Sequence, residues 1–556
     1  MKRTDNLLDQ VAANRKSHFR LFLSVLLVLS LLMMYFYNPL QPGQDFFFHY
    51  RRLQALMDGM GTGPYLIYLD YGAMDGYGYF AKAFYPDFVL IPFACIGNLT
   101  SIEFAYQFMI FTMTILCGIF TYIFVNKVYK NSFAASVSAL LYTFAVYRLL
   151  DIYHRAAIGE ALTFTFLPLV FLGLYHIIKG DYKKWYILAI GFSLMILTHL
   201  ISSLLLFITV LIFFVIYYKP LFREPQRVRC LLLAGAATVF ITAYYTFPMI
   251  EQMASGTFYY ESRDLMSKTQ DSALKMNWIV WGLFSGIIHP RQVFIPGTGL
   301  LLTCAVALRL FVYGKSKELR SADILVILGL AFVFASSFLF PWSIFPFNKL
   351  NFIQLPWRLF EFSTFFFAVA GGYYLSQAFK SRKRLAVAGF SIVIVIVSVM
   401  ANDGKLYQDV RSNRPITQVA ALENDYHLGG LEYMPDKVPS PEYIAQRGDR
   451  VGKKYEDTKV TSFRKGGVTV LDIITSEPET LELPLLYYKG YKAVFNGEEI
   501  QVSESGNGLV QIPVEKSGSA TIYYAGTFIQ KSGYYITLIS IIALCVFIAL
   551  QRRKVL

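Results

Sequence analysis

The sequence predicts a polytopic α-helical membrane protein with about twelve transmembrane helices and a β-sandwich-like domain outside the membrane near the C-terminus. Of its 556 residues, 55% are hydrophobic and only 16% are charged, whereas soluble domains carry about 25% charged residues. Long apolar runs recur along most of the chain. The segment 402–532 instead shows short runs of alternating hydrophobicity, separated by Gly, Asn and Ser, which are typical of β-strands and turns.

The apolar runs define the predicted spans, because a bilayer core needs roughly 20 apolar residues per helix. The first run follows a basic tail and lacks a cleavage signature, so we expect a retained helix and not a removed signal peptide. Three stretches, 38–101, 251–292 and 342–358, do not fit simple spans and are expected outside. The predicted spans are 19–37, 103–126, 132–149, 160–178, 185–200, 202–218, 230–250, 293–312, 322–341, 359–379, 384–400 and 534–551.

Basic residues fall in every second connection between these runs, which orients the chain by the positive-inside rule. With a cytoplasmic N-terminal tail, both termini are predicted to be cytoplasmic. The net charge of +14 then reflects topology, and no nucleic-acid partner is indicated. The basic connections contain Lys127 and Lys130; Lys179, Lys183 and Lys184; Lys219, Arg223, Arg227 and Arg229; Lys315, Lys317 and Arg320; Lys380, Arg382, Lys383 and Arg384; and Arg552 to Lys554.

The chain is predicted to have three parts. Residues 1–401 form a multi-helix membrane module, whose first outer loop covers 38–101. This loop contains an apolar piece that is too short to cross and is expected to lie along the membrane surface. Residues 402–532 form the β-rich domain, and 533–556 form a last transmembrane helix with a basic cytoplasmic tail. The five cysteines lie in or beside apolar runs, so no disulfide framework is predicted.

Polar residues gather on the outer side, beginning in the first outer loop. Asp45 and His49 lie one helical turn apart directly after the first span, followed by Asp70 and a Gly-Tyr-Gly-Tyr element with Tyr77 and Tyr79. A carboxylate at this boundary can act as a general base toward a hydroxyl acceptor. The alternative is that Asp45 only caps a helix, since Asp after Pro-Gly is a good helix starter.

Later outer connections add more ionisable groups. Arg155 and Glu160 share one short connection, His199 lies between two closely linked helices, and Arg358 stands at the mouth of a later helix. Arginine suits phosphate, because its planar donors can bind two oxygens. Each of these residues also has a structural explanation, as a charge at a helix end, a satisfied histidine or an interfacial anchor.

An outward-facing site limits the substrate. The sequence contains no phosphate-binding glycine loop and no cytoplasmic domain large enough for a nucleotide sugar or ATP. A polyprenyl-phosphate-linked sugar fits, because its lipid lies between helices while its phosphate reaches the outer boundary. The predicted reaction is glycosyl transfer with a lipid phosphate as leaving group, in which Asp45 is the base and His49 orients it. A divalent metal is compatible with this chemistry, but no residue pattern indicates one.

The sequence also resembles a family. GQDFFFHYRRLQALMDG, DYGAMDGYGYFAKAFYPDFVL, HRAAIGEALTFTFLPLVFLGL, LTHLISSLLL and FIQLPWRLFEF resemble bacterial membrane proteins labelled 6-pyruvoyl-tetrahydropterin synthase-related. LPLLYYKGYKAVFNGEEI resembles the outer β-domain of YfhO-like proteins. Both groups are similar to the GT-C superfamily, whose members take sugars from polyprenyl phosphates.

The resemblance implies specific roles and a location. Asp45 takes the place of the carboxylate base of the first outer loop, and Arg155, Glu160, His199 or Arg358 line the cavity for the donor phosphate and the acceptor. It implies a bacterial plasma-membrane enzyme that acts on an envelope glycopolymer or glycolipid. The Trp-Trp-Asp type of motif found in oligosaccharyltransferases is missing from the sequence. Two other classes stay open: a transporter or flippase of lipid-linked sugars, and a non-catalytic assembly protein whose β-domain binds a partner.

Overall fold

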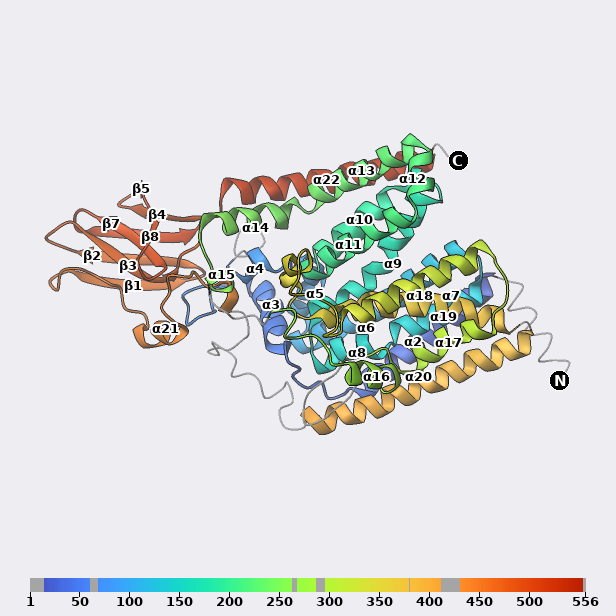
Figure 1. Cartoon of the computed structure of the whole chain (residues 1–556). Helices are drawn as coiled ribbons and strands as arrows, with labels where there is room; N and C mark the ends of the chain where they lie inside the picture. The colour runs from blue at the N-terminus through green and yellow to red at the C-terminus, as the bar shows by residue number, and fades with distance from the viewer. Residues whose placement is uncertain are drawn as a thin grey trace. The chain divides into compact units, whose positions relative to one another are not determined.

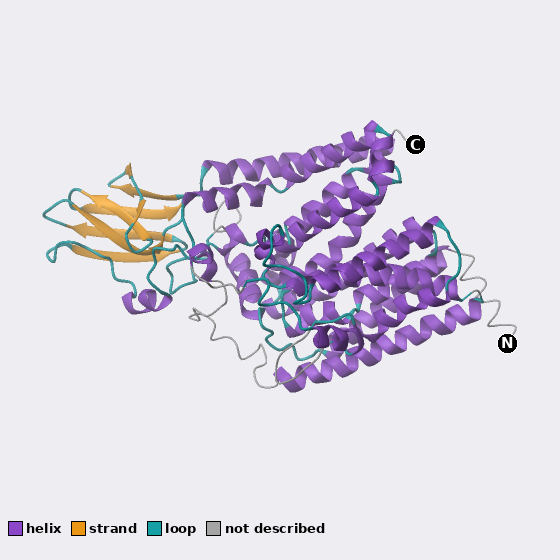
Figure 2. Cartoon of the chain, viewed as in Figure 1, coloured by secondary structure: helices purple, strands orange, loops and turns teal. Residues whose placement is uncertain are grey.

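The computed structural model describes residues 15–60, 69–262, 268–286, 296–379, 381–411 and 431–553. The described chain is mostly helical, and its β-strands belong to the C-terminal part (Figures 1 and 2). Contacts between residues divide the chain into two compact units. The first unit comprises Met1–His49, Glu103–Ala236 and Ser267–Gln418, and the second comprises Tyr50–Ile102, Ala237–Met266 and Val419–Leu556.

The first unit is a bundle of helices. Its elements follow the apolar runs of the sequence, and several are interrupted by short 3-10 or π turns. They are α2 (Arg15–Phe36), α6 (Ile102–Tyr129), α7 (Ser132–Thr143), α8 (Val146–Leu149), α9 (Ile158–Ile178), α10 (Tyr186–Ile196), α11 (Leu200–Ile216), α12 (Tyr218–Arg223), α13 (Pro225–Ile241), α16 (Met276–Phe284), α17 (Gly299–Ala307), α18 (Lys317–Ala335), α19 (Phe360–Ala378) and α20 (Arg382–Arg411).

The predicted count of about twelve spans is not confirmed. The described residues contain six helices long and apolar enough to cross a membrane, or up to seven if the bent pair α13 and α14 (Ala243–Ser255) forms one span. The predicted span 185–200 is the 11-residue α10, and 293–312 contains the 9-residue α17. An apolar run predicts an apolar helix but does not show how many residues the helix contains. The basic tail before Arg15 and the chain end at Lys554 lie outside the described residues.

Helix α19 forms the centre of the first unit. It is buried on nearly all sides, as expected for a helix that is apolar around its whole circumference. It packs against α7, α17 and α18. A Cβ on Gly372 would lie only 2.7 Å from the backbone nitrogen of Ser138, so a small residue is what lets α7 and α19 approach closely. In α20, by contrast, only 17% of the most apolar window is buried, as expected for a helix at the periphery.

The second unit combines short helices with the β-rich domain. The first-loop helix α3 (Phe46–Gly59) continues into it, and α14 packs against the C-terminal helix α22 (Phe528–Arg553). The apolar piece predicted at the membrane surface is helical over Phe88–Leu99. The remaining α-helices of the second unit are α4 (Ala81–Phe84), α5 (Ile91–Leu99), α15 (Tyr259–Ser262) and α21 (Pro441–Arg447).

A β-rich part near the C-terminus is confirmed, whereas its bounds of 402–532 stay a prediction. The strands form two antiparallel sheets (Figure 2). One sheet has the order β1-β2-β8-β4-β5 and the other has the order β3-β7-β6. Asn496 and Gly497 both have positive φ between β4 and β5, as a type I′ hairpin turn requires. The strands are β1 (Lys459–Lys465), β2 (Val468–Ile474), β3 (Glu479–Leu486), β4 (Tyr491–Phe495), β5 (Glu498–Ile500), β6 (Ser503–Glu504), β7 (Leu509–Val514) and β8 (Gly518–Tyr524).

Candidate active site

The break between α8 and α9 shapes the candidate site in the first unit. After α8 the chain forms a π-helical turn over Leu150–His154, and α9 begins at Ile158. Between them Ala156 has φ of +52°, a left-handed conformation that costs an L-residue about 1–2 kcal/mol. Such strain and π turns are concentrated at functional sites. Here the break places the guanidinium of Arg155 between two carboxylates.

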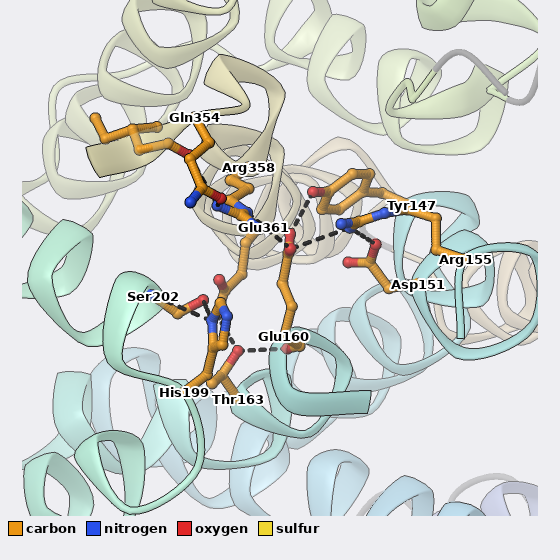
Figure 3. Close-up of polar contacts among 11 residues, drawn as sticks. Tyr147, Asp151, Arg155, Glu160, Thr163, His199, Ser202, Gln354, Arg358 and Glu361 are labelled. Carbon is orange, nitrogen blue, oxygen red and sulfur yellow. Dashed lines mark hydrogen bonds and ion pairs between the residues drawn. The ribbon is translucent and has the colours of Figure 1, made fainter. Parts of the chain in front are cut away.

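A buried ion-pair network links Arg155, Glu160 and Arg358 (Figure 3). Nη1 of Arg155 lies 2.5 Å from Oδ1 of Asp151 and 3.0 Å from Oε2 of Glu160. Nε of Arg358 lies 3.4 Å from the same Oε2. Side chains predicted from separate connections of the sequence therefore meet at one carboxylate. Because removal of one partner from a buried pair leaves an uncompensated charge, the network is expected to hold the two arginines firmly in place.

Neutral groups fix the orientation of this network. The hydroxyl of Tyr147 donates a 2.6 Å hydrogen bond to Oε1 of Glu160. Nη1 of Arg358 donates to the side-chain oxygen of Gln354 at 3.0 Å, and Gln354 itself has φ of +61°. The guanidinium of Arg155 lies 4.5 Å from the ring centroid of Trp357, a distance at which a cation is attracted to the ring face.

Both arginines keep donors that the protein does not use. Arg155 bonds through Nη1, and Arg358 bonds through Nε and Nη1. Within the described part of the chain, Nη2 of each arginine makes no hydrogen bond or ion pair. Arginine carries five N–H donors in a fixed plane, so the free edges of the two guanidinium groups can bind an anion such as phosphate.

A second buried carboxylate, Glu361, follows Arg358 by three residues at the start of α19. Its Oε1 accepts a 2.6 Å hydrogen bond from Thr163, and its Oε2 is buried without a hydrogen-bond partner among the described residues. His199 caps α11, because its Nδ1 accepts from the backbone N–H of Ser202 at 3.3 Å. Figure 3 shows His199 beside Glu361. His199 is therefore both a helix cap and a neighbour of the candidate site.

The first outer loop brings Asp45 to this network. Its backbone N–H donates to the carbonyl oxygen of Arg155 at 2.7 Å. A Cβ on Gly43 would lie 2.6 Å from Cβ of Ala156, so the close approach of the two backbones requires glycine. The Asp45 side chain is open to solvent. Partial removal from water nevertheless raises its pKa, while the charges of Arg155 and Arg358 act to lower it.

Asp45 and His49 form the predicted helical turn at the start of α3. The backbone N–H of His49 donates to the carbonyl oxygen of Asp45 at 3.2 Å, which places Asp45 at the N-cap position. The His49 side chain is buried. Asp45 therefore directly precedes α3 and lies within electrostatic reach of Arg155 and Arg358. Its roles as helix cap or as base, and a role for His49 in orienting it, stay predictions.

The other predicted loop residues belong to the second unit. Asp70 forms a two-pronged ion pair with Arg51, in which both N···O distances are 2.8 Å. The Tyr77 hydroxyl donates to the carbonyl oxygen of Gly448 at 2.6 Å, and the Tyr79 hydroxyl accepts from the backbone N–H of Tyr433 at 3.2 Å. Burial raises the pKa of Tyr77 to about 12. All three residues thus have structural contacts, and their role in substrate binding stays a prediction.

Across the described ranges, no group of three or more His, Cys, Asp or Glu side chains is arranged to hold a metal ion. Polar contacts of the network are instead between carboxylates, arginines and hydroxyl groups.

Two members of the network, Tyr147 and Thr163, are not among the residues that the sequence analysis predicts for the site. Both lie inside runs that are apolar enough to be predicted as spans, where hydroxyl-bearing residues are usually satisfied within their own helix. Thr163 follows Glu160 by three residues, so the spacing that places two side chains on one face of a helix was the available signal. Tyr147 offers no such signal, because its partner lies beyond a break in the helix.

Comparison with known proteins gives relatives at low identity. No family model matches the chain, so the resemblance to YfhO-like proteins stays a prediction. An uncharacterized protein of Lactococcus lactis subsp. cremoris is 21% identical over 599 residues, covering 96% of this chain and 95% of its own. This similarity extends along nearly the whole chain and assigns no activity.

Two solved structures of glycosyl-transferring enzymes are similar to parts of the chain. One is the arabinofuranosyltransferase AftD from Mycobacteria, with 12% identity, 70% of this chain covered and a TM-score of 0.45. The other is the oligosaccharyltransferase of Archaeoglobus fulgidus, with 17% identity, 69% of this chain covered and a TM-score of 0.35. The matches span 27% of the first enzyme and 55% of the second.

Proposed function

We propose that the chain is a membrane glycosyltransferase that moves a sugar from a polyprenyl-phosphate donor to a hydroxyl group of an envelope glycopolymer or glycolipid. The observation that carries the proposal is the pair of buried arginines with unused Nη2 donors beside the solvent-open carboxylate of Asp45. A transferase of this kind needs a binding group for the leaving phosphate and a base for the acceptor hydroxyl. The site supplies both within one cluster.

The arginines stabilise the leaving group in this proposal. As the bond between the anomeric carbon and the phosphate oxygen breaks, negative charge grows on that oxygen. Arg358 and Arg155 are already oriented by Glu160, so their free donors require little reorganisation when the charge develops. Donors placed in advance at a developing negative charge are among the largest contributions to catalysis.

Asp45 acts as the general base. It accepts the proton of the acceptor hydroxyl, the hydroxyl oxygen attacks the anomeric carbon, and the electron pair of the broken bond leaves with the lipid phosphate. Attack from the face opposite the phosphate inverts the anomeric configuration. A base must be ionised to act and must reach its proton within hydrogen-bonding distance. The open side chain of Asp45 satisfies the need for access.

The excess of carboxylates over arginines also has a function in this reaction. Glycosyl transfer passes through a transition state in which positive charge develops on the sugar ring. Glu160 forms ion pairs with both arginines and supplies a negative charge beside them. A site that held only cations would bind the phosphate but would oppose charge development on the sugar. The mixed cluster can stabilise both ends of the breaking bond.

The proposed setting follows from the charge pattern of the sequence. We place the active cluster on the outer side of a bacterial plasma membrane, with both termini in the cytoplasm. The lipid of the donor would lie between helices of the first unit, and the β-rich domain would hold the acceptor. Gln44 is exposed next to Asp45. A single cysteine at position 44 can therefore show on which side of the membrane the first loop lies.

The test combines cells and topology. Mass spectrometry of envelope polymers should show a sugar that disappears when the gene is deleted and returns with the wild-type chain. Asp45→Asn should not restore it, whereas the control Asp271→Asn, which alters an exposed aspartate, should. In a cysteine-free background, Gln44→Cys should react with an impermeant thiol reagent from outside. Full restoration by Asp45→Asn, or reaction of Gln44→Cys only from the cytoplasm, would overturn the proposal.

A further inference from the structure

A cavity lies within the first unit, at the opposite end of α9 and α11 from the ion-pair network. It measures about 370 Å³ and is lined by residues of α6, α9, α11 and α18, a size typical of small-ligand sites. The network uses the beginnings of α9 and α11, at Glu160 and His199, whereas the cavity uses their ends, at Lys179 and Tyr217. Lys179 follows Glu160 by 19 residues along α9, so these two charged groups are separated by roughly 28 Å of helix.

The cavity changes from apolar to polar along its depth. Phe171 on α9 and Leu325 on α18 line its inner part. Lys179 follows Phe171 by eight residues, and Lys317 precedes Leu325 by eight residues. Eight residues of helix span about 12 Å. Phe213 on α11 and Tyr217, four residues later, repeat the same order. The lining is therefore amphipathic, with an aromatic and aliphatic interior and a basic rim.

The rim carries more positive than negative charge. Lys179 and Lys317 face one acid, Glu318, and neither ammonium group forms an ion pair with any residue described in the structure. The ammonium of Lys179 instead lies 4.3 Å from the ring centroid of Tyr217. A cation that rests on an aromatic ring and forms no ion pair with the described residues can accept an anionic group without first breaking such a pair.

We propose that this cavity binds an anionic membrane phospholipid, with an acyl chain in the apolar interior and the phosphate between Lys179 and Lys317. This end of the bundle is the one that the positive-inside rule predicts to be cytoplasmic, and the cytoplasmic leaflet attracts basic residues through its anionic lipids. The site is separate from the proposed donor site, because one lipid phosphate cannot reach both ends of α9. A free fatty acid shares this chemistry, since it also has an acyl chain and an anionic group.

The experiment measures lipid binding to the purified full-length chain by native mass spectrometry, and activity does not enter the readout. Phosphatidylglycerol should be retained about tenfold or more above phosphatidylcholine, because each lysine near a membrane surface contributes about 1 kcal/mol toward an anionic lipid. The double change Lys179→Gln with Lys317→Gln should remove that preference. The control Lys127→Gln with Lys183→Gln alters two exposed lysines outside the cavity lining and should keep it.

A third variant tests the interior. Val128 lines the cavity and is half-buried, so Val128→Trp should fill the space and reduce retention of phosphatidylglycerol while both lysines remain. Equal retention of the two lipids by the wild type, or unchanged preference in the double glutamine variant or in Val128→Trp, would overturn the proposal. Lysine-dependent binding of oleate without binding of phosphatidylglycerol would also overturn it, and would assign the cavity to a free fatty acid.

Discussion

Gly43 offers a test of how closely the first outer loop must approach the π turn. In Gly43→Ala, the new Cβ would lie 2.6 Å from Cβ of Ala156 and 2.8 Å from the carbonyl carbon of Arg155. Neither atom belongs to a flexible side-chain end, so the two backbones must separate by about 0.8 Å to reach ordinary contact at 3.4 Å. The 2.7 Å bond between the Asp45 N–H and the Arg155 carbonyl would then stretch beyond the usual 2.7–3.2 Å range.

The expected consequence falls mainly on activity. A displacement of about 1 Å at a reacting group can reduce a rate by roughly 100-fold, whereas overpacking of this kind costs about 1–3 kcal/mol of stability. We therefore expect the rate of sugar transfer in membrane vesicles to fall by about two orders of magnitude in Gly43→Ala, with a modest drop in melting temperature.

Two further variants control this experiment. Gly235→Ala places a methyl group where no atom lies within 4 Å, in the middle of α13, and is expected to keep activity and to gain up to about 1 kcal/mol of helix stability. Ala156→Gly combined with Gly43→Ala removes the shorter of the two contacts and should recover part of the rate. A Gly43→Ala protein with wild-type transfer rate would refute the requirement for close approach.

Three other predictions concern the ion-pair network. Arg358→Lys keeps the charge but loses the planar donors, so transfer should slow by about 10²–10³-fold, and a wild-type rate would contradict the role in leaving-group binding. Because reduced hydration raises the pKa of Asp45, the acid limb of the pH profile of kcat/KM should lie above the ordinary aspartate value of about 3.9. Arg358→Gln should move this limb to higher pH by removing a charge that lowers that pKa, and Arg358→Lys should leave it in place. Tyr147→Phe leaves Oε1 of Glu160 without its 2.6 Å donor and should cost about 1–3 kcal/mol; an unchanged melting temperature would count against the network.

The sequence singles out several polar residues that the structure brings together. Asp45, Arg155, Glu160 and Arg358 were identifiable because a charge at the edge of an apolar run is uncommon and must be solvated or paired. The structure places these residues together. Their mutual contacts were not predictable, because the π turn and the positive φ of Ala156 leave no pattern in hydrophobicity.

Hydropathy predicts about twelve spans, a count that the described residues do not confirm, and there is a physical reason for the difference. A short helix can be as apolar as a helix that crosses the bilayer, so composition alone does not give its length, and α10 and α17 are examples. Period-two alternation gave a more reliable prediction for the β-rich domain, because the two sides of a strand face different environments. The Asn496–Gly497 turn was likewise visible, since positive φ at two successive positions restricts the residues that fit.

The central claim is that Asp45 removes a proton from an acceptor while two arginines receive the leaving lipid phosphate. The most direct measurement is the release of polyprenyl phosphate from a polyprenyl-phosphate sugar by the purified chain in nanodiscs, in the presence of envelope acceptor. Asp45→Asn should lower this rate by about 10²–10⁴-fold with an unchanged melting temperature. Release by a folded Asp45→Asn protein at the wild-type rate would contradict the account.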